Sequence, residues 1–208
     1  MALQPTIFVV DDDAGVRDAF RAVLESDGYF NISTYESSRR FIEEAALQNG
    51  DCVLLDYYMP DLDGLVVQEK LNRLGLRVSV IVITGRAEYS IAVKALRAGA
   101  VDFIEKPVST AALLSSVRSS LAVAEEPELG LTKAEHILRR LKLLTPRERE
   151  VFDRIVQGWP SKLIAYGLSI STLAVEMHRA TVMGKMQALN LAALIHMALA
   201  VGTIGKSL

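Results

Sequence analysis

Five polar residues stand at the ends of four apolar segments of this chain: Asp11 and Asp12, Asp56, Thr84, and Lys106. Each apolar segment is typical of a buried strand in a parallel sheet. Parallel strands end on one edge of a sheet, where open α/β folds bind ligands, so these side chains are expected to lie close together. Three carboxylates at short range repel one another unless a cation neutralises them, and such oxygen ligands suit Mg²⁺.

Asp56 is the expected centre of this site, because it directly follows the apolar run 52–55. An ionised carboxylate can act as a nucleophile and form an aspartyl phosphate. Lys106 would bring positive charge to the phosphoryl oxygens, and Thr84 would bring a hydroxyl donor. Each residue alone has a simpler explanation, such as a strand-end cap or a solvated charge, but together they favour a phosphoacceptor.

An enzyme of the haloacid-dehalogenase phosphatase type also uses an aspartate at a strand end. That class needs a second aspartate two residues later as general acid, and here the position is Tyr58. A phenol with a pKa near ~10 is a poor acid for this task. We therefore expect no enzymatic activity beyond self-catalysed phosphorylation of Asp56 and slow loss of its phosphoryl group.

Short apolar runs alternate with amphipathic segments through the first part of the chain. Strands are predicted at 6–10, 31–34, 53–55, 79–83 and 101–104, and helices at 16–26, 37–48, 65–74, 89–98 and 110–123. Five strands that alternate with helices, without hairpin signals, predict an α/β doubly wound five-stranded parallel sheet. Asp13, Asp61 and Asp63 are expected to be solvated turn residues.

The second part of the chain is predicted to be all-α. Residues 125–130 are polar and interrupted by proline and glycine, which is typical of a linker. Helices are expected at 132–143, 145–157, 161–166, 172–188 and 190–200. Thr145 begins a capping box, and Ser161, Ser171 and Asn190 are further candidate caps. The short turn after Gly167 makes the third and fourth helices a helix-turn-helix candidate.

Composition and charge agree with two modules in a soluble protein. No apolar run reaches the length of a membrane span, and the N-terminus has no signal-like segment. Cys52 is the only cysteine, which excludes an internal disulfide and suits a reducing cytoplasm. Residues 1–122 carry a net charge of −5 and residues 145–208 a net charge of +3. The basic end is consistent with a polyanionic partner.

The first part of the chain resembles the receiver domain of two-component response regulators over residues 4–122. The matching positions are Asp11-Asp12, Asp56 with Met59-Pro60 and Gly64, Thr84-Gly85, Ala98-Gly99-Ala100 and Lys106-Pro107. The resemblance implies a flavodoxin-like receiver at residues 1–122, a sensor histidine kinase as phosphodonor, and a cis peptide bond before Pro107.

The resemblance also implies the roles of individual residues. Asp12, Asp56 and the backbone carbonyl of Tyr58 would hold Mg²⁺, and Asp11 would act through a water molecule. Phe103 would be the aromatic side chain that moves inward when Thr84 turns toward the phosphate.

Two further positions are implied to control hydrolysis of the phosphoryl group. Tyr58 and Arg86 lie two residues beyond Asp56 and Thr84, where members of the family tune the access of water. Both side chains are large, so we expect the phosphoryl group to live longer than in a variant with Tyr58→Ala and Arg86→Ala.

The C-terminal helices resemble the LuxR/NarL-type helix-turn-helix over residues 138–202, and the matching segments are 144–151, 162–165, 170–171, 175–179 and 185–186. With a receiver in front, the whole chain looks like a FixJ-type response regulator. We expect a linker at 123–137 and a DNA-binding domain at 138–208. The resemblance places helix 172–188 in the major groove of double-stranded DNA. The implied contacts are Glu176, Met177 and Ala180 with base edges, Lys162, Arg179 and Lys185 with phosphates, and Ser171 and His178 in the same region.

Two features of the recognition helix depart from the family. Leu173 and Ala174 replace the usual polar pair at its start, and Gly184 in its interior costs up to ~1 kcal/mol relative to alanine. Both changes are expected to weaken or redirect DNA binding.

The predicted function is phosphorylation-dependent control of transcription by a DNA-binding protein that dimerises when phosphorylated, with RNA polymerase as a further partner and no membrane contact. The alternative is a phosphotransfer or protein-interaction regulator whose helix-turn-helix no longer reads specific DNA.

Overall fold

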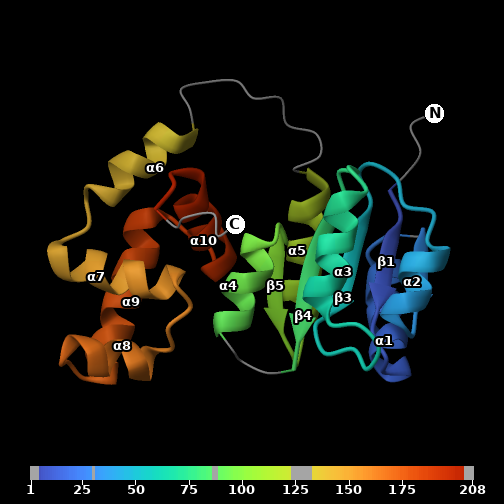
Figure 1. The fold of residues 1–208 in the computed structure, drawn as a ribbon, viewed down its shortest axis with the longest axis horizontal. Coiled ribbons are helices and arrows are strands. Elements are labelled where there is room, and N and C mark those ends of the chain that lie inside the picture. Colours follow the sequence, from blue (N-terminus) through green and yellow to red (C-terminus); the bar gives the residue numbers. More distant parts are fainter. Residues whose placement is uncertain (1–4, 30, 86–88, 123–132, 204–208) are drawn as a thin grey trace. The chain divides into compact units, whose positions relative to one another are not determined.

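A computed structural model of the chain describes residues 5–29, 31–85, 89–122 and 133–203 (Figure 1). The chain divides into two compact units, one of residues 1–87 with 98–127 and one of residues 88–97 with 128–208. Arg86, predicted to control hydrolysis, and most of the predicted linker lie outside the described residues.

The first unit is built on one parallel sheet. Among the described residues its strands are β1 (Ile7–Val10), β2 (Ile32–Tyr35), β3 (Cys52–Asp56), β4 (Ser79–Thr84) and β5 (Asp102–Glu105). All pairs are parallel and the spatial order is β2-β1-β3-β4-β5. The predicted doubly wound five-stranded sheet is confirmed, and β2 lies at its edge as the sequence indicated.

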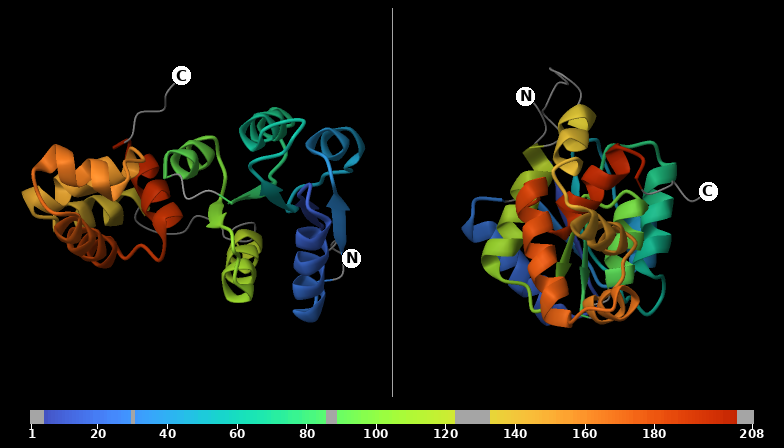
Figure 2. Two further views of the ribbon diagram at one scale, coloured as in Figure 1. Left: turned by 90° about the horizontal axis from the view of Figure 1, so that it is seen from below. Right: turned by 90° about the vertical axis from the view of Figure 1, so that its left-hand side faces the viewer.

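Helices cover both faces of this sheet. The first unit has α1 (Ala14–Ser26), α2 (Ser38–Glu44), α3 (Gly64–Arg73) and α5 (Thr110–Ala122), while α4 (Tyr89–Arg97) follows β4 in the chain. Helices α1 and α5 lie on one face and α2 and α3 on the other (Figure 2). Helix α2 is shorter than predicted, because the backbone at Ala45 is extended and ends it after Glu44.

The hydrophobic core under α1 and α5 joins both helices to the three central strands. Its buried members include Ile7, Val9, Phe20, Leu24, Leu54, Ile81, Ile83, Leu113 and Val117. Cys52 is fully buried beside Ser120, with Sγ and Oγ 3.3 Å apart. Burial raises the pKa of the Cys52 thiol to about 12, so the thiol is protonated and inert at neutral pH.

The C-terminal part is helical throughout its described residues. It contains α6 (Lys133–Leu141), α7 (Pro146–Val156), α8 (Ser161–Leu168), α9 (Thr172–Met186) and α10 (Leu191–Ala200). Their buried face includes Val151, Phe152, Ile155, Ile164, Val175, Val182, Leu194 and Ile195. Among the described residues no single helix is long and apolar enough to cross a membrane, and α9 and α10 meet that criterion only as a bent pair.

Helix N-caps fix the starts of α7, α9 and α10 as predicted, whereas α9 ends at Met186, two residues before the predicted end. The Thr145 hydroxyl and the Glu148 carboxylate form the capping box, Ser171 accepts from the Ala174 N–H at 3.1 Å, and Asn190 caps α10. The prediction for Ser161 was wrong, because Pro160 holds the N-cap position and Ser161 is already helical. Helix α8 also continues past the predicted stop to Leu168.

Candidate functional site

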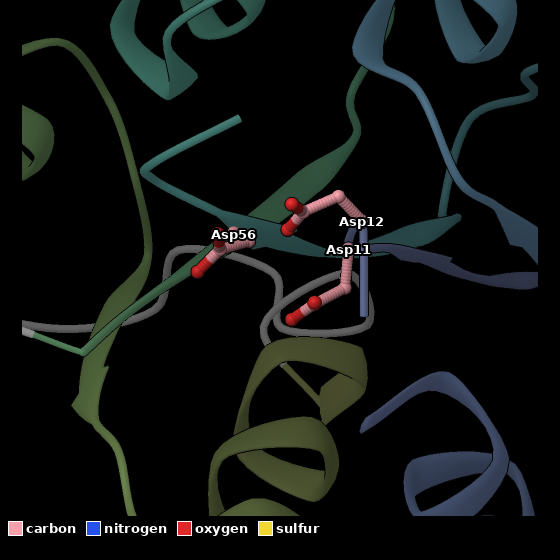
Figure 3. Close-up of side chains that lie close together, drawn as sticks. All are labelled: Asp11, Asp12 and Asp56. Atoms are coloured by element: carbon pink, nitrogen blue, oxygen red, sulfur yellow. The ribbon is translucent and has the colours of Figure 1, made fainter. Parts of the chain in front are cut away.

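Three carboxylates meet at the carboxyl edge of the sheet. Asp11 follows β1 and Asp56 ends β3, and these strands are paired in register up to the residues just before them. The ligand oxygens of Asp11, Asp12 and Asp56 all lie within 4.8 Å of one another (Figure 3). Asp11 and Asp56 are buried whereas Asp12 is exposed. The cluster therefore has one side open to solvent, from which a ligand can enter.

Lys106 supplies the positive charge at this cluster. Its Nζ lies 2.7 Å from Asp11 Oδ2 and 3.1 Å from Asp56 Oδ1. The residue follows β5, and its backbone N–H donates to the Thr84 carbonyl at 2.7 Å, which ties it to the end of β4. The predicted cis peptide bond between Lys106 and Pro107 is confirmed.

The pKa values of the ion pair follow from burial and charge. Burial raises the pKa of Asp56, and the charges of Asp11 and Asp12 act in the same direction, while Lys106 opposes them. Burial lowers the pKa of Lys106, but its hydrogen bond to Asp11 and the charges of both carboxylates outweigh burial and raise it. Lys106 is therefore cationic at neutral pH. One lysine does not neutralise three carboxylates, so a further cation beside Asp56 would be favourable.

The donor set fits a hard divalent cation. Three carboxylates in one cluster provide only oxygen ligands, which Mg²⁺ and similar ions prefer over imidazole or thiolate sites. Burial is the main cause of the raised pKa of Asp56, and the cation would relieve the repulsion from Asp11 and Asp12 that adds to it.

The two residues expected to respond to phosphorylation lie on neighbouring strands. Thr84 is the last residue of β4 and is fully buried. Phe103 lies in β5 and is half-buried, two residues before Glu105, the partner of Thr84 in the register. Strand pairing thus brings both residues to the same end of the sheet as Lys106.

Tyr58 lies beside the acidic cluster in sequence and is partly open to solvent, with 39% of its surface exposed. Its ring packs edge-on against buried Tyr57, with centroids 4.9 Å apart and planes at 79°. This contact holds the Tyr58 ring near the loop that follows Asp56.

Family comparisons identify both parts of the chain. Residues 7–118 match the family described as response regulator receiver domain, and residues 142–198 match bacterial regulatory proteins of the luxR family. The chain belongs to the response regulators.

Relatives of this response regulator match it over nearly their full length. The transcriptional regulatory protein FixJ of Azorhizobium caulinodans is 37% identical over 94% of this chain and 92% of its own. The tetrathionate response regulatory protein TtrR of Salmonella typhimurium is 37% identical over 91% and 90%. The crystal structure of full-length FixJ from B. japonicum covers 98% of this chain and all of its own, with 32% identity and a TM-score of 0.54.

The residues predicted to meet DNA occupy different environments in the luxR-family domain of this response regulator. Lys162 is exposed at the start of α8, and Glu176, Met177 and Ala180 are exposed on α9. The Ser171 hydroxyl caps α9, and His178 is half-buried.

The two basic residues of α9 have protein partners that the sequence did not reveal. The side chain of Arg179 is only 14% exposed, and its Nε lies 3.7 Å from Glu176. Lys185 Nζ is 2.6 Å from the carboxylate of buried Glu148 and 3.1 Å from the Leu143 carbonyl. Their contacts with phosphates stay predictions, and Lys185 has in addition a structural role that joins α9 to α7.

Several residues around the acidic cluster have roles that sequence reasoning missed. Arg17 Nη1 donates to the backbone carbonyls of Asp11 at 2.7 Å and of Asp12 at 3.0 Å, which holds the loop that carries both carboxylates. Asp13 and Asp63 are exposed as expected, but they also cap α1 and α3. Helix N-cap preference could have identified these two caps, whereas nothing local marks Arg17.

Proposed function

We propose that this response regulator accepts a phosphoryl group on Asp56 from a sensor histidine kinase and thereby controls DNA binding and transcription. The proposed receiver spans residues 1–122, the linker 123–137 and the DNA-binding domain 138–208. The observation that carries the proposal is the pairing of Lys106 with both Asp11 and Asp56 in a chain that matches a receiver and a luxR-family domain.

The proposed reaction is a phosphoryl transfer between side chains. A carboxylate oxygen of Asp56 attacks phosphorus, and the bond from phosphorus to the kinase imidazole breaks, with its electron pair left on nitrogen. Lys106 balances charge on the transferred oxygens, and the Thr84 hydroxyl donates to one of them. Positioning and charge neutralisation therefore supply most of the rate enhancement.

Mg²⁺ would be held by the carboxylates of Asp12 and Asp56 and by the backbone carbonyl of Tyr58, with Asp11 acting through a water molecule. When bound, it neutralises charge on the phosphoryl oxygens.

Replacing Asp12 with asparagine is expected to raise the dissociation constant of Mg²⁺ at least about tenfold, since even the outer partners of metal ligands contribute that much. Isothermal titration calorimetry measures the change. The matched control is Asp13→Asn, because Asp13 is the exposed neighbour outside the cluster and asparagine can still cap α1. Equal losses in both variants would contradict the assignment.

The phosphoryl group would act by shifting a conformational equilibrium. Thr84 turns toward the phosphate, Phe103 fills the space that it leaves, and the receiver then favours a homodimer that binds operator DNA. RNA polymerase is a further partner of the bound protein, and the cytoplasm is the proposed location.

Tyr58→Ala is expected to shorten the lifetime of the phosphoryl group several-fold, because the proposed role of the Tyr58 ring is to limit the access of water to Asp56. The rate of autodephosphorylation measures this after transfer from a small phosphodonor. Tyr58→Phe keeps the ring contact with Tyr57 and serves as control. Adding Arg86→Ala to Tyr58→Ala extends the test, and a parent protein that loses its phosphoryl group as fast as the variants would contradict the role.

Mobility-shift assays with genomic fragments test the function as a whole. Specific retardation that strengthens when the protein is phosphorylated is expected. A protein that takes up phosphate but retards no fragment specifically in either state would favour the phosphotransfer or protein-interaction alternative.

A further inference from the structure

Helix α9 has one face that is exposed to solvent. The exposed residues recur every three or four positions and are Thr172, Leu173, Glu176, Met177, Ala180, Thr181 and Gly184. The opposite face holds Val175, Val182 and Met186, which are buried. The helix is thus anchored by one stripe and presents the other outward.

The chemistry of the exposed face is unusual for a surface that meets DNA. All residues of α9 are described, and this face carries no lysine, arginine, asparagine or glutamine. Those side chains make the bidentate hydrogen bonds that identify guanine and adenine in the major groove. The Thr181 hydroxyl donates to the Met177 carbonyl at 3.0 Å, and Glu176 can only accept, for instance from a cytosine amino group.

Leu173 and Met177 are the large apolar side chains of this face. Leu173 is 72% exposed and Met177 is 65% exposed. They are four residues apart, so their side chains lie one helical turn apart on the same face. Both belong to the first two turns of α9, the part of a recognition helix that contacts base edges.

We propose that Leu173 and Met177 read the methyl groups of thymines in the major groove. The thymine methyl is the apolar group that base edges present there, and apolar side chains recognise it by contact. The inference rests on the proposed function, because it specifies how the same domain distinguishes its operator.

Charge near this face selects duplex DNA as the occupant. Residues 145–208 carry a net charge of +3, and Lys162 is exposed at the start of α8, the first helix of the helix-turn-helix. The N-terminus of α9 adds the positive end of a helix dipole beside Leu173. An apolar stripe flanked by positive charge fits base edges between two phosphate backbones.

Each methyl contact is expected to change affinity by a measurable factor. Burial of one methyl group contributes about fourfold in a binding constant. Substitution of deoxyuridine for thymidine removes the methyl group and leaves every hydrogen-bonding group of the base pair in place.

The test begins with selection of duplexes from a random library by the phosphorylated full-length protein. Each thymine of the selected site is then replaced by deoxyuridine, one at a time. We expect at least one position in each half-site to lose about fourfold in affinity. A selected site that tolerates every replacement without loss overturns the inference, while specific binding of that site leaves the proposed function intact.

Variants assign the methyl contacts to the two side chains. Leu173→Ala or Met177→Ala should weaken binding of the thymine site and abolish its sensitivity to deoxyuridine. Leu189→Ala is the matched control, because Leu189 is 98% exposed but lies beyond α9. Full sensitivity in both α9 variants overturns the assignment. Failure to select any duplex contradicts the proposed function itself and is thereby distinguished from failure of methyl readout.

Discussion

Asp56→Asn is expected to abolish uptake of acid-labile phosphate from a kinase or a small phosphodonor. The amide is neutral and is not a nucleophile toward phosphorus, and it also removes one of the three carboxylates of the cluster. Radiolabel retained after gel separation, and its loss in acid, measures the reaction.

Asp63→Asn is the matched control for this experiment. Asp63 lies in the loop after the same strand, is exposed and caps α3, a role that asparagine can keep. Its variant should incorporate phosphate like the parent protein. Acid-labile label that survives in Asp56→Asn would place the phosphoacceptor elsewhere and contradict the central assignment.

The strands were predicted closely because long apolar runs between polar turns leave few alternatives. The end of α2 was not, because a distant contact decides it. The buried carboxylate of Asp51 accepts from the Gln48 N–H at 2.7 Å and from the Thr6 N–H at 2.8 Å. Asp51 thereby holds the chain before β3 in a non-helical conformation. This contact with Thr6 is distant in the sequence, so the helical periodicity of residues 37–48 could not indicate it.

Topology explains why the acidic site could be predicted. Asp11 and Lys106 are separated by 95 residues, yet both follow parallel strands and must reach the same sheet edge. The partner of Lys185 could not be predicted in this way. Its pairing with Glu148 depends on how α9 crosses α7, which no strand register or local motif specifies, so the resemblance indicated only a phosphate contact.

The exposure of α9 also changes how its unusual start is interpreted. From the sequence, Leu173 and Ala174 are only a departure from a polar pair, which predicts weakened or redirected DNA binding. The structure shows that Leu173 and Met177 share one exposed face whereas Arg179 lies mostly inside. A recognition surface of this kind replaces hydrogen-bond readout by apolar contact rather than simply losing contacts.

Glu148→Ala is expected to destabilise the C-terminal domain by about 3 kcal/mol, because it leaves Lys185 without its partner in a partly enclosed site. The same carboxylate accepts from the Thr145 N–H at 2.7 Å, so the capping box is lost as well. Trp159 is the only tryptophan and lies between α7 and α8, so its fluorescence during urea unfolding reports on this domain. DNA affinity should fall too, since Lys185 no longer fixes the end of α9.

The pH dependence of stability should reveal the same ion pair. The hydrogen bond from Lys185, with that from the Thr145 backbone, lowers the pKa of Glu148. A lowered pKa in the folded state means that the stabilisation is complete above the ordinary pKa of the carboxyl group and is lost as the pH falls through the folded value. The parent domain should therefore lose stability in acid more steeply than Glu148→Gln, whose side chain does not titrate.

Glu150→Ala is the control on the same helix. Its carboxylate pairs with Arg147 at 2.7 Å, but the side chain is 49% exposed, so the change should stay within about 0.5 kcal/mol. Equal losses of stability from Glu148→Ala and Glu150→Ala would show that removal of a negative charge from α7, and not loss of the ion pair with Lys185, causes the effect. If Glu148 links the capping box to α9 through Lys185, only Glu148→Ala should cause a large loss of stability. That loss should be smaller when Lys185 has already been replaced.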